Sequence, residues 1–379
     1  MILDFSRKRE IAYAGHLPGL AIVADDLTGA CDAAVAFAGR DTTVRVCLDG
    51  LPAETNDAYA VTTESRDVAP DEAIAKLARL AELIPQSAEI FKKVDSMFRG
   101  NTFAEIAASM HCFPARLTVL APAYPAHGRR VKGGLLHVKG PTECVLMDLV
   151  AGLRAVGSEP LVVTVGEDAE ERLWTAPHGA LLLCDAWEQN HLETLARAAA
   201  RVSERILWIG SGGLAQALAG CRGAVAEFHR EAWPSGRTIF IVGSDHATTR
   251  QQVLHLREVA GVPVSGHGEG ARKNPSSFVL EVPRSTEVEA MRTALAEIDP
   301  ADTACLFLTG GDTAMLACRA LGIQSLRLLR EFASGVPMGI AEGGAFDGVR
   351  VMMKSGGFGE RDLLQRVLEA FHDKDIVTA

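Results

Sequence analysis

The sequence lacks several features that mark common classes of protein. Its eight cysteines, among 379 residues, include no C-x-x-C pair and no ligand spacing typical of a structural zinc site. It contains no run of about 18 apolar residues that could cross a membrane. With a net charge of -10, it also lacks the basic excess typical of proteins that bind nucleic acids or anionic membranes. We therefore expect neither a nucleic-acid partner nor a membrane partner.

The cysteines and the N-terminus both indicate a cytoplasmic protein. Cys47, Cys184 and Cys305 lie inside apolar runs, which is typical of buried, reduced thiols. The N-terminal stretch MILDFSRKREIAYAGHLPG lacks the long apolar segment of a secretory signal peptide. We expect a cytoplasmic location.

What the sequence does contain is a repeated alternation of strand and helix patterns. Short apolar runs are followed by segments with helical spacing, such as PDEAIAKLARLAELI and HLETLARAAARVSER. This alternation predicts an α/β fold with mainly parallel sheets, and the continuous hydrophobicity of the strands indicates that helices cover both faces. The predicted strands are 20–24, 43–48, 58–63, 89–94, 117–122, 160–165, 180–185 and 205–210.

The pattern breaks near EAWPSGR, where proline, serine and glycine cluster before a new strand. We place a domain boundary here, with residues 1–232 as the first domain and 233–379 as the second. The second domain repeats the α/β pattern through the strands TIFIVG, SFVLEV, ACLFLT and VRVMMK. We expect the active site in the cleft between the domains.

Three strand-to-helix junctions in the second domain are rich in glycine: IFIVGSDHATT, LFLTGGDTAML and VMMKSGGFGER. The N–H groups and dipole at a helix N-terminus attract an anion, and glycine lets the backbone approach a ligand closely. The junctions predict a phosphate site without the Walker A pattern of P-loop NTPases, although a tight turn also explains each glycine alone. The candidate ligands are Ser244, Gly310, Gly311, Asp312, Thr313, Lys354, Gly356 and Gly357.

Three strand ends in the first domain carry acids and bases instead: VADDLTG, KKVDSMFRGN and PAYPAHGRR. If these strands are neighbours, their side chains converge in one cleft. The set then suits a ligand with both a carboxylate, which arginine binds, and hydroxyls, which carboxylates bind. The alternative is a group of surface salt bridges. The candidates are Asp25, Asp26, Asp95, Arg99, Asn101, Gly128 and Arg129.

Two further patterns allow more than one interpretation. His127 and His246 lie in these motifs and are better explained as hydrogen-bonding neighbours than as catalytic bases. The stretch ILWIGSGGLAQAL fits the weak dinucleotide pattern G-x-G-x-x-A through Gly210, Gly212 and Ala215, but the acid expected about 20 residues later is missing. Close packing of a helix on a strand explains these small residues better.

An ordered set of motifs runs along nearly the whole chain: ADDLTGACD, KVDSMFRGN, APAYPAHGR, GSGGLA, VGSDHATTRQQ, LTGGDTAMLACRALG and a C-terminal stretch at 336–359. Together they resemble the four-carbon acid sugar kinase family. The resemblance implies an N-terminal domain that binds an acid sugar and a C-terminal domain that binds ATP. It implies phosphoryl transfer from ATP, with Mg²⁺, to a terminal hydroxyl of erythronate, threonate or an oxo-tetronate.

The resemblance also suggests a role for each group of residues. Asp26 or Asp25 would orient the hydroxyl and accept its proton, and only one of them is expected to act directly because neighbours on a strand point to opposite sides. Arg99 and Arg129 would hold the substrate carboxylate. The residues do not identify metal ligands or the oligomeric state, although a homodimer is possible.

Two other functions stay open at this point. A nicotinamide-dependent oxidoreductase of a hydroxy acid rests on the G-x-G-x-x-A pattern alone. A non-catalytic acid-sugar-binding protein rests on Met97 and Gly357, because the family usually has threonine and asparagine at these positions.

Overall fold

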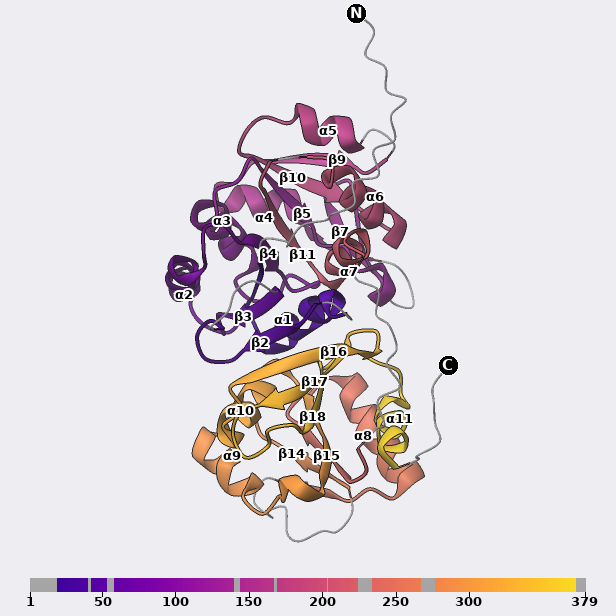
Figure 1. Cartoon of the computed structure of the whole chain (residues 1–379). Coiled ribbons are helices and arrows are strands. Elements are labelled where there is room, and N and C mark those ends of the chain that lie inside the picture. Colours follow the sequence, from indigo (N-terminus) through magenta and orange to yellow (C-terminus); the bar gives the residue numbers. More distant parts are fainter. Residues whose placement is uncertain are drawn as a thin grey trace, which may run out of the picture.

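A computed structural model describes residues 19–39, 42–52, 58–139, 144–166, 169–202, 204–223, 234–266 and 277–372. The predicted domain boundary lies between residues 224 and 233, outside the described residues, and stays a prediction. The predicted α/β class is confirmed: the described strands form one large, mostly parallel sheet with helices on both faces (Figure 1).

The N-terminal half contains most of the strands. Its strands are β1 (Leu20–Ala24), β2 (Val44–Cys47), β3 (Ala58–Thr62), β4 (Glu89–Lys93), β5 (Leu117–Ala121), β6 (Arg129–Lys132), β7 (Leu135–Val138), β8 (Cys144–Asp148), β9 (Pro160–Thr164), β10 (Ala180–Asp185) and β11 (Ile206–Gly210). Its helices are α1 (Leu27–Ala34), α2 (Pro70–Leu83), α3 (Thr102–Cys112), α4 (Leu149–Ala155), α5 (Ala169–Thr175), α6 (Gln189–Ala199) and α7 (Gly212–Cys221), with 3₁₀ turns at Val35–Phe37 and Pro125–His127.

The C-terminal half is smaller. Its strands are β12 (Arg237–Val242), β13 (Val264–Gly266), β14 (Phe278–Glu281), β15 (Thr303–Thr309), β16 (Ser325–Ala333), β17 (Val336–Glu342) and β18 (Arg350–Lys354). Its helices are α8 (Ala247–Ala260), α9 (Val288–Leu295), α10 (Gly311–Leu321) and α11 (Leu363–His372), with a 3₁₀ turn at Pro300–Asp302.

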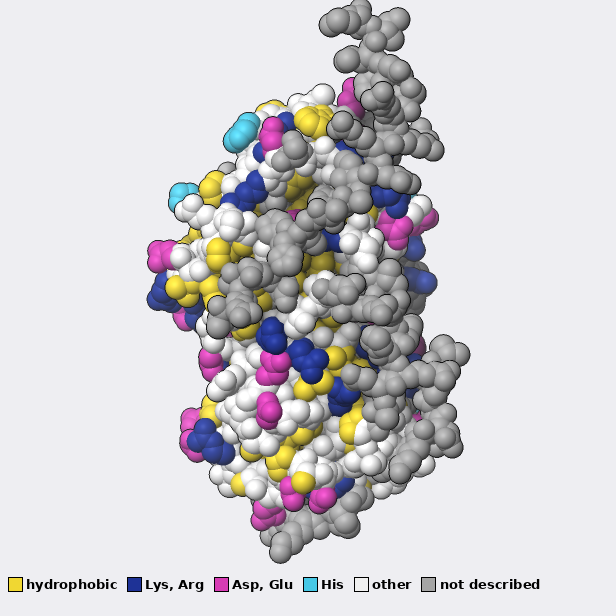
Figure 2. Space-filling view, viewed as in Figure 1, with side chains coloured by type: hydrophobic (Ala, Val, Ile, Leu, Met, Phe, Trp, Pro, Cys, Tyr) yellow, Lys and Arg dark blue, Asp and Glu magenta, His cyan; other side chains and the backbone are white. Residues whose placement is uncertain are grey.

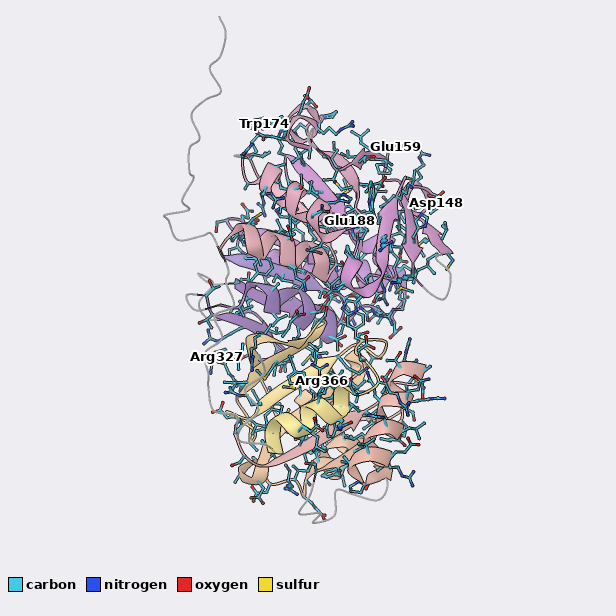
Figure 3. All side chains as sticks on the ribbon, turned by 90° about the vertical axis from the view of Figure 1, so that its right-hand side faces the viewer. Asp148, Glu159, Trp174, Glu188, Arg327 and Arg366 are labelled. Atoms are coloured by element: carbon cyan, nitrogen blue, oxygen red, sulfur yellow. The ribbon has the colours of Figure 1, made fainter. Side chains whose placement is uncertain are left out.

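The two halves share one sheet, which the sequence did not predict. The strand order is β13-β14-β12-β15-β18-β17-β16-β2-β3-β1-β4-β11-β5-β10-β9. The hairpin β16–β17 is antiparallel, and β16 also pairs antiparallel with β2, so that Arg327 lies opposite Arg45. Figure 3 shows Arg327 at the level where the halves meet. A separate small sheet, β6-β7-β8, lies beside the N-terminal half.

The order of the central strands decides which loops meet. Strand β1 lies between β3 and β4, and β11 lies between β4 and β5, all in parallel. The loops that follow these strands therefore leave the same edge of the sheet. The strands are almost fully buried, as the continuous apolar runs predict.

The surface and the cysteines fit the composition. Charged side chains of both signs are spread over the face seen in Figure 2 rather than gathered into a basic band. All eight cysteines are free thiols, and Cys47, Cys184 and Cys305 are buried. Among the described residues, no helix combines the length and the apolar character that a membrane span requires.

Candidate active site

The two adjacent aspartates after β1 have different surroundings. Asp26 caps α1: its Oδ1 accepts a hydrogen bond of 2.7 Å from the Gly29 N–H, and its Oδ2 accepts one of 2.8 Å from the Thr28 hydroxyl. Such a cap satisfies free N–H groups of a first helical turn. Asp26 lines a cavity, whereas Asp25 is not among the residues that line it.

Arg66 joins these aspartates, and no motif in the sequence pointed to it. It follows β3, and its guanidinium donates to both oxygens of Asp25 at 2.7 and 2.9 Å and to Asp26 at 2.5 Å. Asp95 lies 3.6 Å away. Burial would lower the pKa of Arg66, but the charges of Asp26 and Asp25 outweigh it and raise that pKa. Arg66 therefore stays charged and balances several buried carboxylates.

A second layer of polar contacts supports the loop that carries Arg66. The Asn101 amide donates to the carbonyls of Ser65 and Val68 at 2.8 and 2.9 Å. The Ser65 hydroxyl donates to Glu105, which also pairs at 2.6 Å with fully buried Lys92. Asn101, predicted as a substrate ligand, thus contacts the loop and is not among the cavity-lining residues.

Asp95 and Arg99 form a close pair beside this network. Arg99 donates to both oxygens of Asp95, at 3.0 and 2.5 Å. Burial alone would raise the pKa of Asp95, but the hydrogen bonds from Arg99 and the charge of Arg66 hold it well below its usual value. Both residues line the cavity, and the charge of Arg99 is already neutralised by its partner.

Arg129 differs from Arg66, Lys93 and Arg99, which also line the cavity, because no described carboxylate pairs with it. Its Nε donates to the sulfur of Met97 at 3.4 Å, and another N–H donates to the His127 carbonyl. The ring of Phe358 lies 5.7 Å from the guanidinium. Gly128, with φ of 70°, ends the preceding 3₁₀ turn and directs the chain into Arg129.

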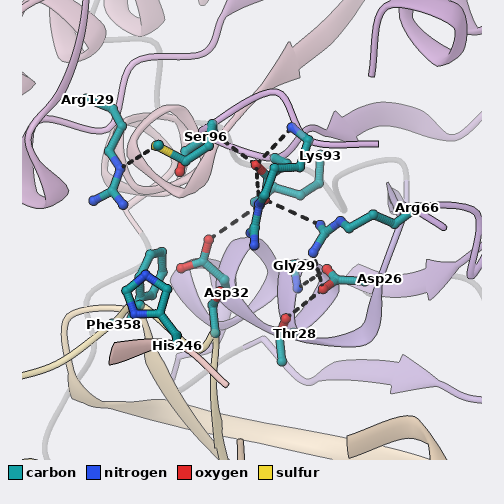
Figure 4. Close-up of a pocket in the computed structure, with 16 residues that line it drawn as sticks. Asp26, Thr28, Gly29, Asp32, Arg66, Lys93, Ser96, Arg129, His246 and Phe358 are labelled. Atoms are coloured by element: carbon teal, nitrogen blue, oxygen red, sulfur yellow. Dashed lines mark hydrogen bonds and ion pairs between the residues drawn. The ribbon is translucent and has the colours of Figure 1, made fainter. Parts of the chain in front are cut away.

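The cavity lies between the two halves and has a volume of about 180 Å³. Figure 4 shows that the N-terminal half supplies most of the charged groups, while His246 and Phe358 come from the C-terminal half. The cavity brings several predicted residues together, and the predicted position of the active site in this cleft stays a prediction. The lining residues are Asp26, Thr28, Gly29, Asp32, Arg66, Lys93, Asp95, Ser96, Met97, Arg99, Arg129, His246, Gly335, Ser355, Gly357 and Phe358.

The two histidines of the motifs make structural contacts. His127 stacks on Phe358 with ring centroids 4.0 Å apart, and burial lowers its pKa to about 4, so it is neutral at pH 7. His246 caps α8, since its Nδ1 accepts a hydrogen bond of 3.2 Å from the Thr248 N–H. Both make hydrogen-bonding or packing contacts here, and the interpretation that neither is a catalytic base stays a prediction.

The three glycine-rich junctions meet at the same edge of the sheet. A Cβ atom added at Gly243 would overlap Thr313, and one added at Gly356 would overlap the Ser244 hydroxyl. Gly310, with φ of 96°, precedes α10. A Cβ atom at Gly311 would overlap the Asp26 carboxylate. The N-terminus of α10 therefore lies directly against the acidic end of the other half.

A second cavity of about 410 Å³ lies beside these junctions in the C-terminal half. It is more than twice the size of the first and includes Ser244, one of the predicted phosphate ligands. The segment after β12 contributes to both cavities, with Ser244 in the larger and His246 in the smaller. The lining residues are Val242, Gly243, Ser244, Asp245, Thr249, Arg250, Val253, Gly266, Glu281, Val282, Pro283 and Arg284.

Lys354 does not line either of these cavities. Its fully buried ammonium donates to the Thr249 hydroxyl and to the carbonyls of Ser355 and Gly356, at 3.0 to 3.1 Å. Burial lowers the pKa of Lys354 to about 7. In this structure the lysine holds the glycine loop in place, and the predicted direct contact with phosphate stays a prediction.

The small residues of the G-x-G-x-x-A pattern are explained by packing. A Cβ atom at Gly210 would overlap the Ala121 carbonyl, and one at Gly212 would overlap the Tyr124 ring. Ser211 caps α7. These glycines allow α7 to approach β5 and its following loop closely, and this contact requires no dinucleotide.

Two family models match separate parts of the chain. A model described as a sugar-binding N-terminal domain matches residues 20–150, and one described as a nucleotide-binding C-terminal domain matches residues 268–364. The first range contains most of the charged residues of the small cavity. The second contains two of the three glycine-rich junctions.

Two curated proteins are similar over almost their whole length. The chain is 33% identical to a D-threonate kinase of Cupriavidus necator, over 92% of this chain and 97% of that protein. It is 28% identical to a D-threonate kinase of Bordetella bronchiseptica, over 94% and 98%. A solved structure from Salmonella typhimurium LT2 superposes with a TM-score of 0.73 over 93% of this chain and 99% of that one, and its 19% identity supports the fold alone.

Proposed function

The chain belongs to the four-carbon acid sugar kinase family, and we propose on that premise that it transfers the terminal phosphoryl group of ATP to the terminal hydroxyl of D-threonate. D-threonate is the first choice because it is the substrate named for both similar kinases. D-erythronate and 3-oxo-tetronate are the alternatives within the same class. We further propose that residues 1–232 bind the acid and residues 233–379 the nucleotide.

The observation that carries the proposal is Arg129 in the small cavity. Its guanidinium has no carboxylate partner among the described residues and faces a cavity that also contains Asp26 and Asp95. A substrate carboxylate supplies the missing partner, and the hydroxyls of a sugar acid can donate to the carboxylates. The volume of about 180 Å³ suits a molecule of a few carbons rather than a nucleotide.

The nucleotide is proposed to bind in the larger cavity, with its phosphates at the glycine-rich junctions. The start of α10 lies against Asp26 at Gly311. The N–H groups of this helix N-terminus would hold a phosphate close to the small cavity. Phosphoryl transfer needs this kind of positioning and charge neutralisation more than covalent chemistry by the protein. Asp26, which lines the small cavity, is the aspartate that would orient the acceptor hydroxyl.

The residues around Asp312 fit a magnesium ion that is bound mainly by phosphates. Burial and the nearby charges of Asp67 and Asp26 raise the pKa of Asp312, and no described cation pairs with it. Mg²⁺ in kinases takes one or two carboxylates, with phosphates and waters completing the site, and no cluster of three ligands occurs among the described residues. Asp312 is the residue that would hold the ion, which would neutralise phosphate charge.

The test is an ADP-release assay with a panel of substrates. We expect ATP and Mg²⁺ to support turnover of D-threonate, with D-erythronate and 3-oxo-tetronate as slower substrates, and no turnover of a three-carbon or a five-carbon acid. Thermal-shift titration should show stabilisation by ATP with Mg²⁺ and none by NAD(H). If no four-carbon acid releases ADP, the kinase proposal is wrong and a non-catalytic binding protein is favoured.

A cytoplasmic location and assembly as a homodimer remain predictions from the sequence.

A further inference from the structure

A third acidic residue of the cavity lies one and a half turns along α1. Asp32 occupies a helix of small residues whose other side chains are apolar or hydroxyl-bearing, and it is 6% exposed. It lines the small cavity together with Asp26. Figure 4 shows its carboxylate between Lys93 and the rings of Phe358 and His246, so it faces both halves of the molecule.

The contacts of Asp32 are few. Its Oδ1 accepts a hydrogen bond of 3.1 Å from the Tyr124 hydroxyl, and its Oδ2 lies 3.6 Å from the Lys93 ammonium. Lys93 is itself 4% exposed, and its ammonium donates at 3.1 Å to the Val94 carbonyl. Each oxygen of Asp32 thus has one ionisable neighbour, Tyr124 or Lys93. Among the described residues, most of the hydrogen-bond-accepting capacity of its carboxylate is unused.

The two aspartates after β1 are much more firmly occupied. Asp26 accepts three hydrogen bonds, from the Gly29 N–H, the Thr28 hydroxyl and Arg66. Both oxygens of Asp25 accept from Arg66. A carboxylate that accepts several charge-assisted hydrogen bonds is held firmly in one position.

We propose that Asp32 is the proton acceptor of the phosphoryl transfer, whereas Asp26 orients the acceptor hydroxyl. The inference rests on the proposed function and assigns a further residue to it. As the hydroxyl oxygen bonds to the γ-phosphorus, the O–H bond breaks and the proton moves to an oxygen of Asp32. The bond from the γ-phosphorus to the bridging oxygen breaks, ADP leaves with its electron pair, and Asp32 later returns the proton to water.

The electrostatics of the site support this division. Burial raises the pKa of Asp32, and Lys93 and Tyr124 offset only part of the rise. The other charged groups that face it are Asp26 on the same helix and Glu331 on β16, and both favour the protonated form. A base with a raised pKa accepts a proton more readily near neutral pH.

The first test compares Asp32→Asn with Asp26→Asn in the full-length enzyme, under single-turnover conditions with ATP, Mg²⁺ and D-threonate. For Asp32→Asn we expect the rate to fall by about 10²- to 10⁴-fold. The KM for both substrates should change by less than about threefold, as for a group that acts in the transition state. Asp32→Glu should recover part of the rate.

The second measurement is the pH dependence, which a purely structural role would not change. The wild-type rate should rise with pH along an acid limb that lies above the ordinary aspartate pKa of 3.8. Asp32→Asn should lose this limb. The Tyr124 hydroxyl donates a hydrogen bond that lowers the pKa of Asp32, so Tyr124→Phe should raise that pKa. The acid limb of this variant should therefore move to higher pH, while its plateau rate at high pH is kept.

The matched control is Asp185→Asn. Asp185 is equally buried and accepts hydrogen bonds from the Gly133 and Gly134 N–H groups, away from the cavity. Its loss should lower the melting temperature and leave the rate unchanged. A thermal shift with ATP and Mg²⁺ that matches the wild type shows that Asp32→Asn is folded. If Asp32→Asn does not fold, the pH profile of Tyr124→Phe tests the role of Asp32 instead.

The outcomes separate the two proposals. Turnover by the wild type, together with a near-normal rate for Asp32→Asn or an unmoved acid limb for Tyr124→Phe, would overturn the role of Asp32 and leave the kinase function intact. No turnover of any four-carbon acid by the wild type would overturn the function itself.

Discussion

Two strand-to-helix junctions face each other across the site, and they differ in both charge and backbone conformation: Asp26 before α1 is extended, whereas Gly310 before α10 has a φ of 96°. After β1, the helix N-terminus of α1 is capped by Asp26, whose carboxylate accepts the first free N–H. After β15, Gly310 precedes α10 and no side chain caps that helix. A helix N-terminus attracts an anion. The first already contains its own anion, whereas the second has no side-chain cap and is the end proposed to bind a phosphate.

The acidic junction also depends on a cation that the glycine-rich junction does not need. Arg66 is 15% exposed in its side chain and contacts Asp25 and Asp26, with Asp95 nearby. Without it, three carboxylates would share one buried region. The junctions therefore differ in charge as well as in backbone conformation, and both differences agree with the proposed hydroxyl-binding and phosphate-binding ends of the site.

The largest effect is expected from Arg66→Met, which removes the cation from the acidic junction only. Loss of one partner of a buried ion pair costs about 3–5 kcal/mol, so we expect a correspondingly lower free energy of unfolding and almost complete loss of kcat. Denaturant unfolding and the ADP-release assay measure the two. Arg154→Met, which breaks the exposed pair with Glu159, is the control and should change neither.

The next effect is expected from Gly311→Ala, in which a methyl group pushes the two junctions apart. The added atom would overlap the Asp26 carboxylate, which is held too firmly to move away easily. We expect kcat/KM for ATP to fall by about 10²-fold, roughly 2.7 kcal/mol.

Gly220→Ala in α7 is the matched control, because a Cβ atom there meets nothing within 4 Å. Alanine is favoured over glycine in a helix, so this variant should be as stable or slightly more stable, with normal kinetics. Equal kinetics for the two variants would show that the two helix ends do not need their close approach.

A smaller effect is expected on the KM for the sugar acid, and it should differ between substitutions of Arg129 and Arg99. Arg129 lacks a carboxylate partner, whereas Arg99 is neutralised by Asp95. Arg129→Met should raise the KM for the sugar acid by about tenfold, worth roughly 1.4 kcal/mol, with little change in kcat. Arg99→Met should raise it less. The reverse order, from steady-state kinetics, would assign the substrate carboxylate to Arg99.

The smallest effect concerns Glu64, which lies near both junctions. Burial raises the pKa of Glu64 from 4.5 to about 7, with Asp26 and Asp312 adding to the rise. Its contribution to stability is therefore full below pH 4.5 and is lost as the pH rises through about 7. Glu64→Gln carries no such loss.

Relative to the wild type, Glu64→Gln should gain stability as the pH rises through this window, by an amount on the order of 1 kcal/mol because the side chain is only partly buried. Urea unfolding at a series of pH values measures it. A difference that stays constant with pH would mean that Glu64 titrates normally in the folded protein.

The sequence was informative wherever a feature is local. The strands 20–24 and 180–185 were predicted with the bounds found for β1 and β10. The glycine-rich junctions and the Asp25–Asp26 pair were also visible, because each is one strand end followed by one helix start. Repeated apolar runs are strong signals when both faces of a strand are buried.

The parts that were missed depend on which strands are neighbours. Arg66 reaches Asp26 only because β3 lies beside β1, and Asp32 meets Lys93 only because β4 lies on the other side of β1. One signal was available for Asp32: it is an ionisable residue in a helix of small, mainly apolar residues. The antiparallel strand β16 escaped prediction because its mixed burial gives no continuous apolar run. Strand β17 is mostly buried, but Pro337 and Gly339 interrupt its strand pattern.

The pairing of β2 with β16 has a consequence for the order in which the protein can form. Val46 pairs with Leu326, so two strands from opposite ends of the chain close one ladder. Contacts between such distant segments form slowly, because a long loop must close first. During synthesis, β2 therefore leaves the ribosome as an unpaired edge of the N-terminal half, with open N–H and C=O groups. The N-terminal half acquires its finished edge only after most of the C-terminal half has been made.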